Sequence, residues 1–76
     1  MKAEVGALYT HYKNKESYKV IAIGFDSETE TEVVVYEGQY NSPQFGNHPV
    51  WVRPRDMFEE KVLYEGQMVP RFEKVG

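Results

Sequence analysis

Apolar and polar residues alternate along this chain in short runs, which are separated by polar turns or by glycine and proline. Such a pattern is typical of β-strands and not of amphipathic helices. The strands predicted in this way are Leu8–Tyr12, Ser17–Phe25, Glu32–Glu37 with an extension at Gln39–Tyr40, Val50–Arg53, Val62–Tyr64 and Gln67–Val69. The last two flank Glu65-Gly66, which predicts a tight hairpin.

The strand at Ser17–Phe25 is apolar on both faces. Alternation assigns its residues to two sets, Tyr18, Val20 and Ala22 on one face and Ile21, Ile23 and Phe25 on the other. Apolar residues on both faces indicate a strand that curls through a small barrel, where bending covers both sides.

Two segments break the strand pattern. Asn41–Pro49 is predicted to be irregular, because it holds two prolines, two asparagines and a glycine. Pro54 then suits the start of a helical turn, since its missing amide hydrogen would have no partner there. The chain at Arg55–Glu60 is predicted to form one or two turns, with Met57 and Phe58 directed inward.

These elements predict a mostly β fold. The expected architecture is a small, SH3-like, partly open barrel of five or six short strands with one short helical turn. A split sheet packed on one short helix is the alternative. Because the chain has 76 residues, we expect residues 1–76 to form a single domain.

The composition limits which interactions can stabilise the domain and in which cellular compartment we expect it. There is no cysteine, so neither a disulfide nor a thiolate metal site is available. Stability must come from packing, to which the 14% aromatic content contributes. The first residues lack the apolar run of a signal peptide, and no stretch approaches the ~20 apolar residues of a membrane span. The expected location is the cytoplasm, without membrane contact.

The net charge of −3 is unevenly distributed. Residues 26–40 hold five acids and no base, residues 1–25 hold four lysines and two glutamates, and residues 41–76 hold five charges of each sign. Nucleic acid and anionic lipid are disfavoured as partners by this balance. We expect a solvated acidic hairpin, which also discourages edge-to-edge aggregation.

Candidate metal and catalytic sites are weak. The acids of residues 26–37 have the spacing of a calcium loop, but Thr31 occupies the position that requires glycine. The chain has only two histidines, His11 and His48, too few and too distant for a zinc site. The serines have no nucleophile-elbow pattern around them, and the glycines are isolated, so neither a hydrolase triad nor a phosphate loop is indicated. We expect no enzymatic activity, no metal and no cofactor.

Aromatic and cationic residues form the strongest candidate for a binding surface. The set comprises Tyr9, His11, Tyr12, Lys13, Tyr40, Trp51, Arg53, Arg71 and Phe72. Alternation places Trp51 and Arg53 on one face of their strand. An aromatic ring beside a guanidinium can stack on a flat ligand while the cation pairs with a carboxylate or phosphate. In the alternative, Trp51 is core and Arg53 pairs internally with Glu59 or Glu60.

Three functions are compatible with this set. The preferred hypothesis is a binding module that recognises a peptide, protein or anionic small ligand. The second is a nucleic-acid-binding small barrel that stacks bases on aromatic rings beside basic groups. The third is a structural or oligomerisation unit, in which the aromatic surface is buried between copies or against a larger protein. The oligomeric state expected is a monomer or a weak homo-oligomer.

Several short motifs also recur in a known family. In chain order they are His11-Tyr12-Lys13, Tyr18-Lys19-Val20, Val34-Val35-Tyr36-Glu37, Trp51-Val52-Arg53-Pro54 followed by Met57-Phe58, and Pro70-Arg71-Phe72. From about Gly6 to Phe72 the chain resembles the small bacterial proteins catalogued as domain of unknown function 1653. The resemblance implies a compact, stand-alone bacterial domain, and it groups His11, Lys13, Arg53 and Arg71 as polar positions of the family motif.

The chain departs from that family at two places. Thr10 and Asn14 stand where family members have an arginine and a glycine, and the segment Asn41–Pro49 is longer than its usual counterpart. The first departure removes a cation from the expected ligand face, and the second alters the approach to Trp51.

Overall fold

A computed structural model describes residues 2–76 of the chain. Its main element is a five-stranded antiparallel sheet with the strand order β6-β3-β2-β1-β9. The strands are β1 (Leu8–His11), β2 (Ser17–Phe25), β3 (Glu32–Gly38), β6 (Val50–Pro54) and β9 (Phe72–Lys74). The sheet is curled, and its two edge strands approach each other. The guanidinium of Arg53 on β6 lies 5.6 Å from the ring centroid of Phe72 on β9. The sheet does not close into a barrel, since β6 and β9 are not hydrogen-bonded neighbours.

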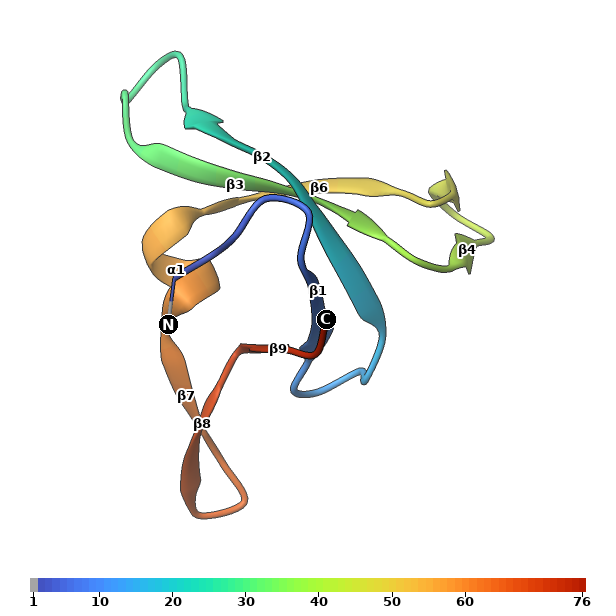
Figure 1. The fold of residues 1–76 in the computed structure, drawn as a ribbon, viewed down its shortest axis with the longest axis vertical. Helices are drawn as coiled ribbons and strands as arrows, with labels where there is room; N and C mark the ends of the chain where they lie inside the picture. Colours follow the sequence, from blue (N-terminus) through green and yellow to red (C-terminus); the bar gives the residue numbers. More distant parts are fainter. Residues whose placement is uncertain (1) are drawn as a thin grey trace.

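Two hairpins and one helix complete the fold (Figure 1). Strand β4 (Asn41–Ser42) pairs with β5 (Gly46–Asn47), and β7 (Lys61–Tyr64) pairs with β8 (Gln67–Pro70). The helix α1 (Arg55–Glu59) directly follows β6. Glu65 and Gly66 at the second hairpin turn both have positive φ, as a tight type I′ turn requires. No helix within residues 2–76 has the length and apolar character needed to cross a membrane.

The mostly β fold with one short helix is confirmed. The strand predicted at Ser17–Phe25 has the observed bounds, but the number of strands differs from the prediction. The described residues form nine short strands in three sheets, not five or six. Two of the additional strands, β4 and β5, lie within the segment predicted to be irregular, and β9 is too short for alternation to reveal it.

A β-bulge in β2 changes which of its residues face the core. The pairing with β3 shifts between Val20 and Ala22, so Ile21 is the extra residue. Beyond the bulge, Ile23 packs against the core and Ala22 is exposed. The strict alternation predicted for this strand is therefore wrong after Val20, because a bulge reverses the face of every residue that follows it.

The core is mostly aromatic. Its largest fully buried side chains are Tyr9, Phe58 and Phe72, with Val20 and Val34 beside them. Helix α1 contributes Phe58 alone to the core, and Met57 remains 42% exposed. The prediction that Met57 also points inward is thus wrong, because a helix this short presents only one position to the sheet.

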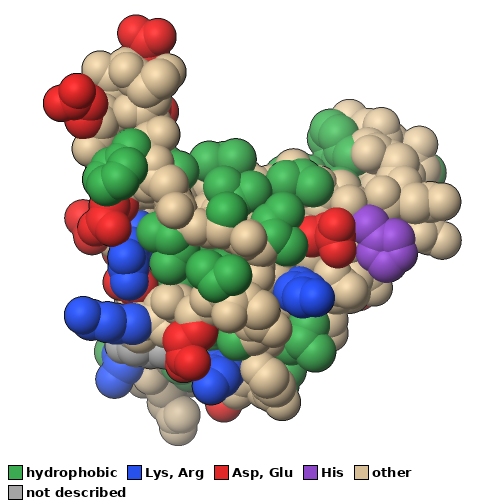
Figure 2. Space-filling model, turned by 45° about the horizontal axis from the view of Figure 1, so that its top comes forward, with side chains coloured by type: hydrophobic (Ala, Val, Ile, Leu, Met, Phe, Trp, Pro, Cys, Tyr) green, Lys and Arg blue, Asp and Glu red, His purple; other side chains and the backbone are tan. Residues whose placement is uncertain are grey.

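The acidic hairpin between β2 and β3 projects from the sheet, and carboxylates gather at its end (Figure 2). The amides of Thr29 and Glu28 donate to the Asp26 carboxylate at 3.1 and 2.8 Å. These hydrogen bonds hold the pKa of Asp26 below its ordinary value. Asp26 therefore has a structural role, because it orders the turn of this hairpin.

Candidate functional site

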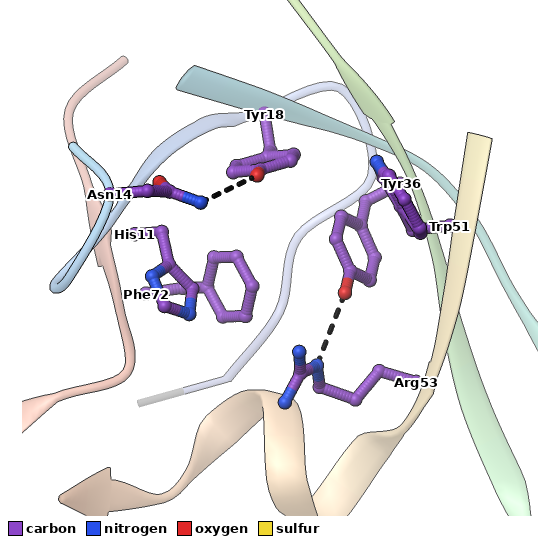
Figure 3. A pocket seen from close by; sticks show the side chains of 7 residues that line it. All are labelled: His11, Asn14, Tyr18, Tyr36, Trp51, Arg53 and Phe72. Atoms are coloured by element: carbon purple, nitrogen blue, oxygen red, sulfur yellow. Dashed lines mark hydrogen bonds between the residues drawn. The ribbon is translucent and has the colours of Figure 1, made fainter. Parts of the chain in front are cut away.

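A cavity of about 220 Å³ opens on the inner face of the curled sheet, the face that carries the core. The residues that line it are His11, Asn14, Tyr18, Tyr36, Trp51, Arg53 and Phe72 (Figure 3). Asn14 lies in the turn after β1, and the others lie on β1, β2, β3, β6 and β9. Every strand of the five-stranded sheet thus contributes to the cavity.

Strand β6 supplies two cavity residues because its register places alternate side chains on the inner face. Trp51 pairs with Tyr36 and Arg53 pairs with Val34, which are both inner-face residues of β3. Both β6 residues are half-buried. The residues between them point outward, and Val52 is 63% exposed.

Arg53 extends from β6 into the cavity with most of its hydrogen-bonding capacity free (Figure 3). Its Nε donates a hydrogen bond to the Tyr36 hydroxyl at 3.1 Å, and its guanidinium lies over the Phe72 ring. Within residues 2–76, its two terminal nitrogens make no hydrogen bond, and it forms no ion pair. The internal pairing with Glu59 or Glu60 considered above does not occur, because those acids bind Arg55 and Arg71.

A chain of hydrogen bonds holds the indole and the tyrosines in place. Trp51 Nε1 donates to the Tyr40 hydroxyl at 3.2 Å, and that hydroxyl lies 3.3 Å from the Tyr18 hydroxyl. The side-chain amide of Asn14 also donates to Tyr18, at 3.1 Å. The two hydroxyls carry two protons, and their mutual bond uses one of them. One hydroxyl proton remains outside this chain of hydrogen bonds.

The tyrosine at the centre of this chain stays neutral over the physiological range. Burial and the hydrogen bond to Tyr40 raise the pKa of Tyr18 to about 12. Tyr18 is therefore a neutral hydrogen-bonding group and adds no negative charge to the cavity.

His11 forms the wall of the cavity opposite β6. Its ring packs edge-to-face on Phe72 with centroids 5.0 Å apart. Its Nδ1 accepts the backbone amide of Lys13 at 3.2 Å, so the neutral ring carries its proton on Nε2. Burial, followed by the charges of Arg53, Arg71 and Lys13, lowers its pKa below 6.5. Arg53, Arg71 and Lys13 thus all lie close enough to disfavour the protonated form of His11.

The structure brings together four of the predicted binding residues, namely His11, Trp51, Arg53 and Phe72. Tyr9 is instead a fully buried core residue, whose ring packs edge-to-face on Phe58. The prediction that Tyr9 belongs to a ligand-binding surface is therefore wrong, because its side chain is inaccessible to a ligand.

The remaining predicted residues lie around the cavity and not in it. The Tyr40 hydroxyl accepts the hydrogen bond from Trp51 Nε1, and Lys13 is exposed beside His11. Arg71 does not line the cavity, because its guanidinium binds the Met57 carbonyl and pairs with Glu60. Tyr12 lines a second cavity of about 190 Å³ under the β7–β8 hairpin, where its ring contacts Tyr64.

Sequence reasoning missed three lining residues, Asn14, Tyr18 and Tyr36. The two tyrosines could have been found from alternation, because each shares a face of its strand with a buried valine, Val20 or Val34. No sequence signal places Asn14, which reaches the cavity through the path of a turn.

Two places singled out in the sequence as departures from the expected family pattern, Asn14 and the segment Asn41–Pro49, lie at this site. Asn14 donates to Tyr18. Phe45, in the turn between β4 and β5, packs edge-to-face on Trp51 with centroids 5.1 Å apart. This segment therefore provides an additional aromatic wall next to the indole.

The cavity combines nitrogen donors with aromatic walls. The described residues that line it include Arg53 and His11 but no carboxylate. Elsewhere within residues 2–76, no three histidine or acidic side chains gather as metal ligands.

Comparison with known proteins gives one family. No curated protein and no solved structure matches the chain significantly. A family model described as protein of unknown function (DUF1653) matches residues 7–74, nearly the whole chain, as the motifs around Trp51 and Arg71 indicated. The chain therefore belongs to the DUF1653 family.

Proposed function

We propose that this domain is a binding module that recognises an anionic group, on a peptide, protein or small ligand, in the cavity between β6 and β9. One observation carries the proposal: Arg53 lies half-buried in an aromatic cavity with its terminal nitrogens unpaired among residues 2–76. Partly buried charges are normally paired. A carboxylate or phosphate would supply the missing partner through charge-assisted hydrogen bonds.

The neighbouring groups suit the same ligand. His11 offers a further donor, and Phe72 and Trp51 provide flat apolar walls. The volume of about 220 Å³ accommodates one side chain or a small anion. This volume is smaller than that of pockets that bind drug-sized ligands. This size favours a carboxylate side chain or a single phosphate over a nucleotide.

The proposed role is binding without catalysis. The lining residues described above include no serine, threonine, cysteine or carboxylate that could act as nucleophile or orient a base. His11 Nδ1 is also occupied by the Lys13 amide.

The test is a chemical-shift titration of the labelled domain with N-acetylglutamate and with inorganic phosphate. We expect the signals of His11, Trp51 Nε1 and Arg53 Nε to shift with one of these anions. The uncharged analogue N-acetylglutaminamide, in which amides replace both carboxylates, is expected to bind about ten-fold more weakly or worse, because hydrogen bonds to charged groups contribute about 1.5–3 kcal/mol.

The variant Arg53→Gln should lose this binding, and the exposed control Lys61→Gln should keep it. Equal affinity for acid and amide, or no shift at the three signals, would overturn the proposal. A short single-stranded oligonucleotide that binds more tightly, with steep salt dependence, would support the nucleic-acid alternative instead.

A further inference from the structure

Strand β6 has one open edge. Among residues 2–76 it is the last strand of the sheet and pairs only with β3. The Gly38 amide donates to the Pro49 carbonyl at 2.8 Å, which fixes the alternation of the ladder. Trp51 and Arg53 therefore direct their amides and carbonyls toward β3, and Val50 and Val52 direct theirs away. Within residues 2–76, no backbone group of another segment forms a hydrogen bond with Val50 or Val52 on this open side.

Prolines limit this edge at both ends. Pro49 precedes β6 and Pro54 ends it, and neither has an amide hydrogen to donate. The open edge thus offers two donors and two acceptors, all from Val50 and Val52. Proline and short length discourage open-ended stacking of strands. An edge of this length is suited to one short extended segment.

The open edge is continuous with the cavity. Trp51 and Arg53 reach the cavity from the same strand whose edge is free. The cavity has room for one side chain, so the remainder of a larger ligand would lie outside it. On the other face of the strand, Val50 and Val52 are 56% and 63% exposed. Figure 2 shows apolar side chains gathered between the two projecting hairpins, over the outer face of the sheet.

We propose that the ligand is an extended peptide that adds as a strand to the open edge of β6 and places one carboxylate side chain in the cavity at Arg53. This inference rests on the proposed function for its anion site and adds the class of ligand. Strand addition obtains affinity from main-chain hydrogen bonds and specificity from alternate side chains. The adjacent unpaired guanidinium identifies one of those side chains as acidic.

The register of β6 gives the pattern of the peptide. Residues opposite each other in a sheet share a face. A residue opposite Arg53 therefore faces the cavity, and residues opposite Val52 and Val50 face the outer, apolar side. In antiparallel orientation the peptide would read glutamate, valine, threonine, valine, with its glutamate opposite Arg53 and its threonine opposite Trp51.

The experiment compares backbone-methylated forms of this tetrapeptide, acetylated and amidated at its ends. The amide of the first valine points at Val52, so its methylation should weaken binding by about ten-fold or more through a lost hydrogen bond and a steric clash. The threonine amide points away from β6, so its methylation should leave the affinity within about two-fold. Equal effects of the two methyl groups would overturn strand addition.

The variant Val52→Pro tests the same edge from the side of the protein. Its amide faces away from β3, so proline there leaves the β3 ladder intact. We expect the variant to bind N-acetylglutamate like the wild type and to lose about ten-fold or more in affinity for the peptide. If the variant does not fold, the pair of methylated peptides decides the question.

The two proposals fail in different ways. If N-acetylglutamate binds and the peptide binds no tighter, the anion site stands and strand addition is wrong. If neither binds, the proposed function itself fails. Sedimentation of the free protein tests a second copy as the occupant of β6. A concentration-dependent dimer that Val52→Pro abolishes would replace the peptide with another copy of this chain, whereas a monomer supports the peptide.

Discussion

The ring of Phe58 stacks on the ring of Phe72, with centroids 4.1 Å apart and planes inclined by 9°. Both rings are buried, and they join helix α1 to strand β9. Phe72 also lies beneath Arg53 and against His11. The stack is therefore both the centre of the core and the floor of the cavity.

Phe58→Ala should be severely destabilising. Removal of a buried phenylalanine costs about 3–5 kcal/mol, and a domain of this length has a total stability of about 4–11 kcal/mol. Denaturant unfolding should show the loss as a lower midpoint. The control is Phe45→Ala, since Phe45 is 58% exposed and its truncation should cost less than about 1 kcal/mol. Equal losses in the two variants would contradict the assignment of the core.

Gly38→Ala should disturb the cavity through Tyr40. A Cβ added at Gly38 would lie 2.6 Å from Tyr40 Cε2, so the Tyr40 ring must shift, and this shift moves the hydroxyl that accepts from Trp51 Nε1. We expect a loss of about 1–3 kcal/mol in stability and a change in the fluorescence of Trp51, the single tryptophan. Gly24→Ala is the matched control in β2, where nothing lies within 4 Å. Unchanged fluorescence in Gly38→Ala would show that Tyr40 does not support the indole.

Glu59→Gln should weaken the attachment of the N-terminal segment to α1. Glu59 Oε2 accepts the Ala3 amide at 2.7 Å and Arg55 Nε at 2.9 Å. Burial raises the pKa of Glu59, but these two hydrogen bonds outweigh it and hold the pKa below 4.5. We expect the variant to lose about 1–3 kcal/mol at neutral pH, measured by denaturant unfolding against the exposed control Glu28→Gln.

The effect of Glu59→Gln should depend on pH in one direction. A carboxyl with a lowered pKa in the folded state contributes stability that is complete above 4.5 and is lost as the pH falls through the lowered value. The stabilities of wild type and variant should therefore converge at low pH. A difference that stays constant down to low pH would contradict the role of the ionised carboxylate.

His11 should make the free domain less stable in mild acid. Its pKa is lowered in the folded state, so the unfolded chain binds the proton more readily. The contribution of His11 to stability is complete above 6.5 and decreases as the pH falls through 6.5 toward the lowered value. His11→Asn retains an acceptor for the Lys13 amide and should remove this dependence. A ring-proton titration by NMR gives the pKa directly.

A bound anion should raise the pKa of His11. A carboxylate at Arg53 offsets the cations that repel the protonated ring, so the pKa of His11 should rise when N-acetylglutamate binds. The affinity should then increase as the pH falls through that value. An unchanged His11 pKa at saturation would place the anion elsewhere.

The sequence was most informative where a strand is regular. Alternation in β6 was sufficient to place Trp51 and Arg53 together, because the pairing of that strand with β3 has no irregularity. In β2 the same reasoning failed after Val20, because a single extra residue reverses which side chains face the core. No residue type in the sequence indicates where such a bulge occurs. Tyr9 shows a different limit: period-two alternation gives a shared face with His11, but not the depth at which each side chain lies.

Side-chain positions that depend on the path of a turn or on the length of a helix could not be predicted from the local sequence. Asn14 reaches the cavity only because the turn after β1 folds back over Tyr18. Met57 stays at the surface because α1 ends too early to bury a second position. Both outcomes depend on tertiary packing, which overrides local propensity.

Because each of the five strands contributes to the cavity, no part of the sheet forms it alone. An occupant would engage the native chain and have little affinity for partly folded forms, so its binding energy is added directly to folding stability. At a ligand concentration one hundred times the dissociation constant this gain is about 2.7 kcal/mol. For so small a domain, thermal melting in the presence of candidate compounds is consequently a sensitive screen that requires no label.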